Sequence, residues 1–320
     1  MTDALLQIRN LTKRFDTASG TVHAVEDVSF DIPRGSIMGL VGESGSGKTT
    51  LGRALLRLVE PTSGQIRFDG TDITTLDAKG MRDMRRRMQI IFQDPVSSLN
   101  PRLKVGDLIA EGLRAFGIGT RRDRRDRVAA LLEEVGLNAD HMNRYPHAFS
   151  GGQRQRIGIA RALALEPDFI VADESVSALD VSIQAQVLNL LLELREKRNL
   201  TMLFIAHDLS VVNYLCDQVA VLYLGRLMEI GPTNRVQRAS AHPYTRALNS
   251  AIPQPDPRAA RNRTPLQGDI PSPLAPPSGC VFRTRCPHVA DLCATGVPDA
   301  HLLGAHHQSY CKRTEELYGH

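Results

Sequence analysis

The chain has 320 residues, of which 42% are hydrophobic and 23% are charged, as in an ordinary globular protein. Its net charge of +4 is mild, and acidic residues interrupt the basic runs Arg82 to Arg87 and Arg121 to Arg127. Because no aromatic residues accompany these runs, they favour solvated helix faces over nucleic-acid binding. No apolar stretch approaches the roughly 20 residues that span a bilayer, and Met1 to Ala4 do not resemble a secretory signal. We therefore expect a cytoplasmic protein that reaches a membrane only through partners.

A buried strand is predicted at residues 36–41, where an apolar run leads into a glycine-rich turn. The turn at 42–49 reads GESGSGKT and matches the P-loop pattern G-x-x-x-x-G-K-[ST]. Its backbone amides, and the start of a helix predicted at 49–58, are expected to surround phosphate oxygens. Lys48 should reach the β- and γ-phosphates of a nucleotide, and the Thr49 hydroxyl should bind Mg²⁺. The predicted nucleotide-binding residues of this segment are Gly42, Glu43, Ser44, Gly45, Ser46, Gly47, Lys48, Thr49 and Thr50.

Residues from about 94 to 165 interrupt the strand pattern and are predicted to form an inserted helical subdomain. Apolar runs at 169–172 and 202–206 predict two further buried strands. Between them, helical spacing predicts one apolar face made of Val187, Leu190, Leu191 and Leu194. Strand, helix and strand in this order predict an α/β fold with a parallel sheet covered by helices.

Residues 149–153 read FSGGQ and precede a helix-like segment. Ser150 is a favourable helix N-cap, and Gly151 and Gly152 let another backbone approach, so that the helix start forms a second anion site. The segment resembles the signature motif of ABC ATPases, usually written LSGGQ. The resemblance implies that two subunits pair head to tail, and that Ser150, Gly151, Gly152 and Gln153 of each close on ATP held by the other.

Two acidic residues end the strand predicted at 169–173, which reads FIVAD and resembles Walker B of the same family. The resemblance implies that Asp173 helps to hold Mg²⁺ and that Glu174 polarises the attacking water. Residues 177–180, SALD, match the loop that communicates across the ABC dimer. The family usually has proline after the glutamate, whereas this chain has Ser175, which constrains the backbone less and adds a hydrogen-bond donor. We expect hydrolysis, at a rate that this serine affects.

Three further residues match single positions of the family. Gln93, in IFQDP, resembles the glutamine that senses the γ-phosphate and Mg²⁺, and His207, in IAHD, resembles the switch histidine that contacts the γ-phosphate. Taken alone, each would suit an ordinary structural role. Phe15, in KRF, is the candidate for the aromatic residue that stacks on adenine, where the family more often has tyrosine; a core position is the alternative.

The composition changes near the C-terminal end of the chain, where eight of the 18 prolines fall between Pro253 and Pro277 and predict an extended connecting segment. Four of the five cysteines follow at the spacing C-x5-C-x6-C-x17-C. Four thiolates can hold Zn²⁺ or a [4Fe–4S] cluster, and either would order a segment too rich in proline to build its own core. The predicted ligands are Cys280, Cys286, Cys293 and Cys311. The fifth, Cys216, is predicted to be a buried core thiol.

Several segments resemble the ATPases of dipeptide and oligopeptide importers. Residues 242–245 (HPYT), 268–273 (GDIPSP) and 276–280 (PPSGC) are similar to their C-terminal extension, and residues 93–102 (QDPVSSLNPR) are similar to the same subfamily. The ending TLGR at 50–53 resembles the second of the two paired ATPase subunits. The resemblance covers nearly the whole chain. It favours an iron–sulfur cluster at the four cysteines, because members of the subfamily carry one there and no paired C-x2-C is present; Zn²⁺ stays the alternative.

The resemblance implies an ABC nucleotide-binding domain at 1–232 and a proline-rich extension with the cysteine site at 233–320. It implies that ATP hydrolysis drives the import of di- or oligopeptides, from the cytoplasmic face of the inner membrane. The implied partners are a second ATPase subunit in a heterodimer, two transmembrane permease subunits that dock beside the Gln93 region and, indirectly, a solute-binding protein. The alternatives are import of nickel or glutathione, and a soluble ABC ATPase that acts on ribosomes or DNA.

Overall fold

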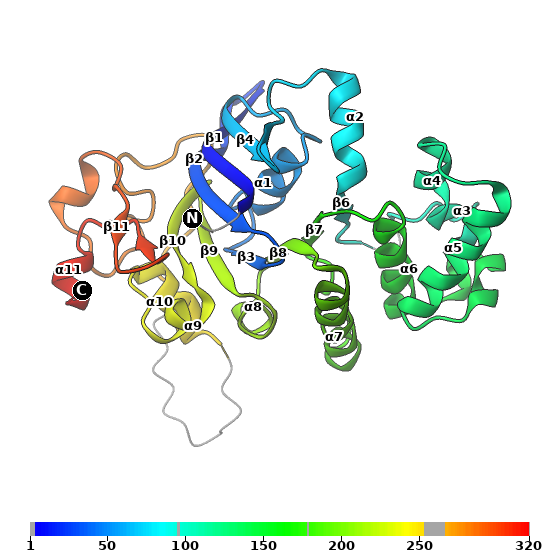
Figure 1. Cartoon of the computed structure of the whole chain (residues 1–320). Helices are drawn as coiled ribbons and strands as arrows, with labels where there is room; N and C mark the ends of the chain where they lie inside the picture. Colours follow the sequence, from blue (N-terminus) through cyan, green and yellow to red (C-terminus); the bar gives the residue numbers. More distant parts are fainter. Residues whose placement is uncertain (1–3, 95–96, 178, 253–265, 320) are drawn as a thin grey trace. The chain divides into compact units, whose positions relative to one another are not determined.

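The computed structural model describes residues 4–94, 97–177, 179–252 and 266–319, which Figure 1 traces in colour. The chain divides into two compact units. Unit 1 consists of Met1–Ile32, Ile37–Thr74 and Phe204–His320, and unit 2 consists of Pro33–Ser36 and Thr75–Leu203. Parts of three predicted segments lie outside the described residues, namely Pro95, Val96, Ala178, Pro253, Pro255, Pro257 and Pro265.

Unit 1 contains an antiparallel sheet that the sequence patterns did not indicate. Its strands are β1 (Ala4–Thr17), β2 (Gly20–Pro33), β4 (Ser63–Phe68) and β5 (Thr71–Asp72), in the order β2-β1-β4-β5. Leu6 pairs with Phe68 and Ile8 pairs with Ile66, and all four side chains are buried. Alternate residues of a strand share one face, so this register gathers apolar side chains on one side of the sheet.

A second group of strands in unit 1 carries the predicted P-loop. The strand expected at 36–41 is β3 (Ile37–Val41), it is wholly buried, and it pairs in parallel with β9 (Gln218–Tyr223). This confirms the buried parallel arrangement. The following strands instead pair antiparallel, in the order β9, β10 (Arg226–Pro232), β12 (Gln308–Ser309) and β11 (His301–Leu302). The helices of the unit are α1 (Lys48–Leu55), α8 (Leu209–Leu215), α9 (Thr233–Arg238), α10 (Pro243–Ser250), η3 (Asp291–Ala294) and α11 (Thr314–Tyr318).

Unit 2 is mainly helical around a short parallel strand pair, β6 (Met88–Ile91) and β7 (Phe169–Asp173). Its helices are α2 (Ala78–Arg87), α3 (Val105–Ile109), α4 (Glu111–Ala115), α5 (Arg121–Glu134), η1 (Ala139–Asn143), η2 (Pro146–Ala148), α6 (Gly151–Leu163) and α7 (Val181–Arg198). The predicted apolar face of α7 is buried at all four positions. The predicted strand at 202–206 is β8 (Thr201–Ala206), which is buried throughout and runs from unit 2 into unit 1.

Both basic runs lie on helices, α2 and α5, and most of their arginine side chains are exposed. This confirms the expectation of solvated helix faces. No helix in the described part of the chain is long and apolar enough to cross a membrane.

The C-terminal extension packs on the strands of unit 1, and Figure 1 shows its red end beside β10. The described part of the proline-rich segment, residues 266–279, contains no helix or strand, as expected. The extension was predicted to have no core of its own, and this stays a prediction. Phe282 is fully buried and packs 5.3 Å from Tyr223 and 5.2 Å from Tyr244 between ring centroids. Phe282 thus belongs to a core that it shares with β9 and α10.

The buried carboxylate of Glu229, on β10, ties the extension to the strands. It accepts hydrogen bonds from the amides of Ala241 (2.9 Å) and His242 (3.0 Å), and it lies 2.8 Å from Nε2 of His307. Glu229 is fully buried and His307 nearly so. A buried charge is tolerated only when hydrogen bonds replace its hydration, so these three partners are expected to be essential.

We predict that Glu229→Ala lowers the free energy of unfolding by about 3 kcal/mol, because it leaves a buried imidazole and two buried amides without their acceptor. Urea unfolding of the purified chain measures the change. The control is Glu60→Ala, which removes an exposed ion pair with Arg57 and should cost no more than about 1 kcal/mol. Equal losses for the two variants would contradict the anchoring role of Glu229.

Candidate functional site

The P-loop connects β3 to α1 and bends so tightly that glycine is required. Gly42 and Gly47 have φ angles of 155° and 98°, values that favour glycine. A Cβ atom at Gly42 would lie 2.1 Å from the carbonyl oxygen of Leu222, and one at Gly47 would lie 2.1 Å from that of Ala24. Both obstacles are backbone atoms, which cannot rotate away. The turn predicted from the glycines is therefore set by close packing as well as by conformation.

The polar groups of the loop converge on its interior. Lys48 is buried, and its Nζ donates to the carbonyl oxygens of Gly42 (2.8 Å) and Glu43 (3.0 Å). The Ser46 hydroxyl is also buried and has no hydrogen-bond partner among the described residues. Buried polar atoms usually have a partner, and a phosphate oxygen would supply one here. The loop thus fits the phosphate groups expected from its sequence.

The remaining nucleotide-site predictions in unit 1 lie at accessible positions. Ser44 and Gly45 are exposed, and Thr49 and Thr50 are half-buried in the first turn of α1. Phe15, on β1, is 37% exposed, so a core role is excluded. The Lys13 ammonium lies 4.7 Å from the centre of its ring, and a cation over a ring face is a stabilising contact.

His207 follows β8 and is exposed. Its neighbour Asp208 caps α8, because the Asp208 carboxylate accepts from the amide of Ser210 at 2.8 Å. The helix therefore starts directly after the histidine. No contact in the described structure assigns the imidazole a structural role.

In unit 2, the predicted catalytic glutamate is held by the predicted sensor glutamine. Gln93 Nε2 donates to Glu174 Oε2 at 2.7 Å. The pairing follows from the parallel register of β6 and β7, in which Ile91 lies opposite Ala172. Gln93 and Glu174 each lie two residues beyond this pair, so their side chains emerge at the same edge of the two strands. Sequence reasoning named both residues but did not predict their contact.

The backbone at Glu174 adopts an unusual conformation. Its φ angle is 42°, in the left-handed region that non-glycine residues rarely occupy. The Glu174 carbonyl oxygen accepts from the amide (3.1 Å) and the hydroxyl (2.9 Å) of Ser177, which closes a turn after β7. The preceding Asp173 is buried at the end of the strand. Such strained positions cluster at active sites, where the surrounding structure maintains them.

Ser175, which replaces the usual proline, turns its hydroxyl into the protein. The residue is 3% exposed, and its Oγ has no hydrogen-bond partner among the described residues. An unsatisfied buried hydroxyl costs stability. The extra donor that the sequence predicted is therefore present but shielded from bulk solvent.

The signature residues start a helix, as predicted. Ser150 is the N-cap of α6: its hydroxyl accepts from the Gln153 amide (3.3 Å), while Gln153 Oε1 accepts from the Ser150 amide (3.1 Å). The two glycines differ in environment. A Cβ atom at Gly152 would lie 2.3 Å from Cγ2 of Ile183 on α7, whereas Gly151 is exposed and meets no such obstacle. Gly152 therefore permits helix packing, and Gly151 leaves the helix start open to a ligand.

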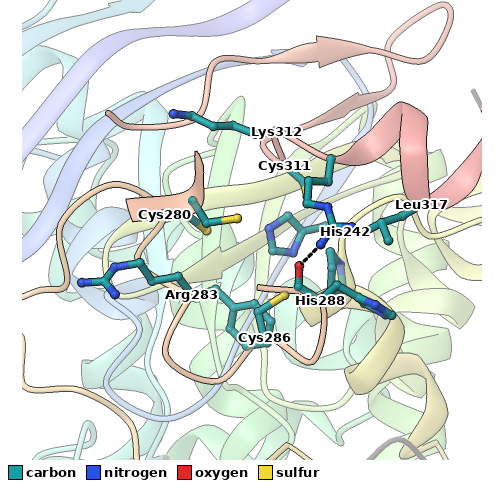
Figure 2. A pocket seen from close by; sticks show the side chains of 12 residues that line it. His242, Cys280, Arg283, Cys286, His288, Cys311, Lys312 and Leu317 are labelled. Carbon is teal, nitrogen blue, oxygen red and sulfur yellow. Dashed lines mark hydrogen bonds between the residues drawn. The ribbon is translucent and has the colours of Figure 1, made fainter. Parts of the chain in front are cut away.

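The four cysteines of the extension gather around one pocket, as their predicted role requires. Cys280, Cys286, Cys293 and Cys311 all line it, and Figure 2 shows three of them around the hollow. The Cys280 amide donates to the Cys293 carbonyl at 2.9 Å, which joins the first and third cysteine loops. Among the described residues, however, no group of three or more His, Cys, Asp or Glu side chains has the arrangement of a metal-ion site.

Burial, with smaller contributions from the nearby cysteines, raises the pKa of Cys280 and that of Cys286 to about 11. The pKa of Cys311 is raised for the same reason. His242, which also lines the pocket, is fully buried, and burial lowers its pKa to about 3. Four soft sulfur donors around one pocket fit a metal or cluster that is held by thiolates. The separate Cys216 is buried, as predicted.

Sequence analysis missed two residues that touch the P-loop, Arg285 and Tyr244. Arg285 Nη1 lies 2.6 Å from Glu43 Oε2, and the Glu43 amide donates to the Tyr244 hydroxyl at 3.0 Å. These partners are separated from Glu43 by 242 and 201 positions. A local sequence pattern cannot predict contacts between residues so far apart in the chain. Tyr244 nevertheless lies in the segment 242–245, and Arg285 directly precedes the predicted ligand Cys286.

A model of the ABC transporter family matches residues 25–177, and a model of the oligopeptide/dipeptide transporter C-terminal region matches residues 228–293. A putative peptide import ATP-binding protein of Brucella ovis is 61% identical over 309 residues, which cover 97% of this chain and 98% of that protein. The chain belongs to the peptide-import family of ABC transporter ATP-binding proteins.

Other members of this ABC family agree with that assignment. The oligopeptide transport ATP-binding protein OppF of Bacillus subtilis is 56% identical over 265 residues, 82% of this chain and 87% of its own length. Among solved structures, cbiO1 of Clostridium perfringens, part of an ABC transporter complex, has a TM-score of 0.65 at 30% identity, covering 73% of this chain and 90% of that one. A dimeric ATP-binding cassette with ADP and Pi has a TM-score of 0.66 at 28% identity, with coverages of 71% and 98%. The α/β ABC ATPase fold is thereby confirmed.

We predict that Ser175→Ala leaves the free energy of unfolding unchanged or raises it by up to about 1 kcal/mol, because it removes a buried hydroxyl that has no partner. The matched control is Ser177→Ala, which deletes the hydroxyl bonded to the Glu174 carbonyl and should cost about 1 kcal/mol. Urea unfolding of both variants provides the comparison. A loss with Ser175→Ala as large as the control would show that the hydroxyl has a stabilising partner.

Proposed function

We propose that this chain hydrolyses ATP to drive the import of di- and oligopeptides through a membrane transporter. The observation that carries the proposal is the hydrogen bond between Gln93 and Glu174, which orients the Glu174 carboxylate at the end of a buried strand. The family membership and the extension matched by the peptide-transporter model support the cargo class. The phosphate-binding loop belongs to unit 1, and Asp173 and Glu174 belong to unit 2.

Binding begins with the phosphate groups. The inward amides of residues 42–49 and the N-terminus of α1 stabilise negative charge, and Lys48 exchanges carbonyl oxygens for the β- and γ-phosphates. The buried Ser46 hydroxyl gains a partner in the same step. The exposed ring of Phe15 is available to stack on adenine. Thr50 lies next to the loop in α1.

Hydrolysis requires a water molecule in line with the γ-phosphate. Glu174 polarises that water, and the amide of Gln93 fixes the direction of its carboxylate. His207 donates to the γ-phosphate as charge develops on it. Thr49, Asp173 and Gln93 are the residues that would hold Mg²⁺, which would neutralise charge on the phosphate oxygens.

A chain with one P-loop has no need of a second phosphate site for its own nucleotide, and the start of α6 resembles such a site. Ser150, Gly151, Gly152 and Gln153 therefore close on the ATP of a second ATPase subunit, in a heterodimer whose two sites are shared. Closing and reopening move two transmembrane permease subunits docked beside the Gln93 region. A solute-binding protein delivers the peptide, so this chain never touches the cargo. The chain works at the cytoplasmic face of the inner membrane. We assign residues 1–232 to the nucleotide-binding domain, with its helical subdomain at about 94–165, and residues 233–320 to the extension.

We predict that Glu174→Gln lowers ATP hydrolysis by the assembled transporter at least about 100-fold while ATP binding persists, because glutamine keeps the shape but cannot accept the proton of the water. Phosphate release and nucleotide titration measure the two quantities. The control is Glu196→Gln, an exposed position on α7, which should leave both unchanged. Undiminished turnover in Glu174→Gln would refute the assignment.

We also propose that the four cysteines hold a [4Fe–4S] cluster, with Zn²⁺ as the alternative. All four line one pocket, and their soft sulfur atoms suit either group. The Cys-Pro pair at 286–287 and the lack of paired C-x2-C spacing favour the cluster. When bound, the group cross-links three loops of the extension and so adds to folding stability.

Protein purified without oxygen is predicted to contain iron and acid-labile sulfide in equal amounts. Cys286→Ser should lose most of both, because serine is a poor replacement for a thiolate ligand. Cys216→Ala, which changes a cysteine outside the pocket, should retain them. Elemental analysis decides the matter, since zinc without iron would overturn the cluster assignment.

A further inference from the structure

The cysteine-bearing loop of the extension contacts the P-loop through one ion pair. Arg285 Nη1 lies 2.6 Å from Glu43 Oε2, and Nη2 lies 3.2 Å from Glu43 Oε1. The Arg285 side chain is 6% exposed and the Glu43 side chain 26% exposed. A bidentate arginine–carboxylate pair fixes both position and orientation, and it does so more strongly when solvent is excluded.

Glu43 is held from a second side through its backbone. Its amide donates to the Tyr244 hydroxyl at 3.0 Å, and Tyr244 is fully buried. Tyr223 lies between the two attachments: its hydroxyl is 3.4 Å from Arg285 Nη1, and its ring centroid is 4.8 Å from that of Tyr244. Phe282, three residues before Arg285, packs on both tyrosines. Arg285 and Tyr244 of the extension therefore both contact Glu43, and the packed rings of Tyr223, Tyr244 and Phe282 hold these two residues in place.

Glu43 also positions Lys48, the lysine expected to bind phosphate. The Glu43 carbonyl oxygen accepts from Lys48 Nζ at 3.0 Å and from the Ser46 amide at 3.2 Å. A displacement of Glu43 would therefore move the two groups that are aimed at the phosphates. Cys286 directly follows Arg285, so the path from the cysteine pocket to Lys48 runs through consecutive bonded or hydrogen-bonded residues.

The charge of Glu43 supplies a reason for the pair. A carboxylate in the second position of the P-loop would repel the phosphate groups of a nucleotide. The guanidinium of Arg285 neutralises this charge and restricts the rotation of the Glu43 carboxylate. An apolar replacement for the pair would pack as well or better, so packing alone does not account for it.

We propose that Arg285 is a positioning residue for nucleotide binding, through which the cysteine-bearing extension controls the P-loop. The inference rests on the proposed ATPase function and names the regulating element of that same site. Arg285 acts through Glu43 and does not touch the nucleotide. The extension is thereby a part of the nucleotide site, because Tyr244 and Arg285 both contact Glu43 of the phosphate-binding loop.

The test is titration calorimetry of the full-length chain with Mg-ADP, which is not hydrolysed. Arg285→Met keeps the length of the side chain and removes its charge, and we expect the dissociation constant to rise at least tenfold. Arg285→Lys, which keeps the charge without the bidentate geometry, should fall between Arg285→Met and the unchanged protein. Because the effect passes through Glu43, adding Glu43→Gln to Arg285→Met should restore part of the affinity by removing the uncompensated charge.

The matched control is Arg283→Met, two positions earlier. Among the described residues, Arg283 donates within its own loop, to the carbonyl (2.8 Å) and hydroxyl (3.3 Å) of Ser278. Arg283→Met also removes one guanidinium from the cysteine-bearing loop, and it should leave ADP affinity unchanged. If Arg285→Met binds ADP like the unchanged protein, or if Arg283→Met weakens binding equally, the proposal is wrong. If Arg285→Met does not fold, Arg285→Lys and Glu43→Gln carry the same test.

Binding of Mg-ADP by the unchanged protein distinguishes a failure of the ATPase proposal from a failure of the role of Arg285. If the unchanged protein failed to bind Mg-ADP, the ATPase proposal would fail together with the inference. If the unchanged protein binds Mg-ADP and Arg285→Met binds it equally, only the role of Arg285 fails.

Discussion

The close passage of the P-loop backbone beside its neighbours is the constraint on which the nucleotide site depends. At Gly42 and Gly47 the nearest obstacles are carbonyl oxygens of Leu222 and Ala24, so the loop has one available path. On that path Lys48 Nζ donates to the carbonyl oxygens of Gly42 and Glu43, and the Ser46 hydroxyl is buried. Because the obstacles belong to β2 and β9, the geometry of the loop depends on strands that lie outside it in the sequence.

Much of the fold could be predicted from local patterns. The buried strands at β3, β7 and β8, the apolar face of α7 and the N-cap at Ser150 each follow from residues within one or two turns of chain. The antiparallel sheet around β1 was missed, since its strands carry polar residues on the outer face and pair across long intervals. The same limit applies to Arg285 and Tyr244, whose roles depend on which distant segments meet.

The site residues show a similar division. Motif positions identified Gln93 and Glu174, but only the parallel register of β6 and β7 shows that one holds the other. For the extension, the prolines predicted a segment without a core of its own, but they could not predict its neighbours. Phe282 and Glu229 show that the extension shares buried apolar and polar contacts with the strands of unit 1. Residue content predicts whether a segment can fold alone, and not whether a neighbour completes it.

The register that joins Gln93 to Glu174 also limits how this family can change in length. Side chains alternate between the faces of a strand, so one residue inserted between Ile91 and Gln93 would turn the amide away from the carboxylate. Insertions among the helices from α3 to α5 would not alter that pairing, because those helices follow Gln93 and end well before β7. Natural variation in length should therefore collect in the helical region and avoid the few residues after β6.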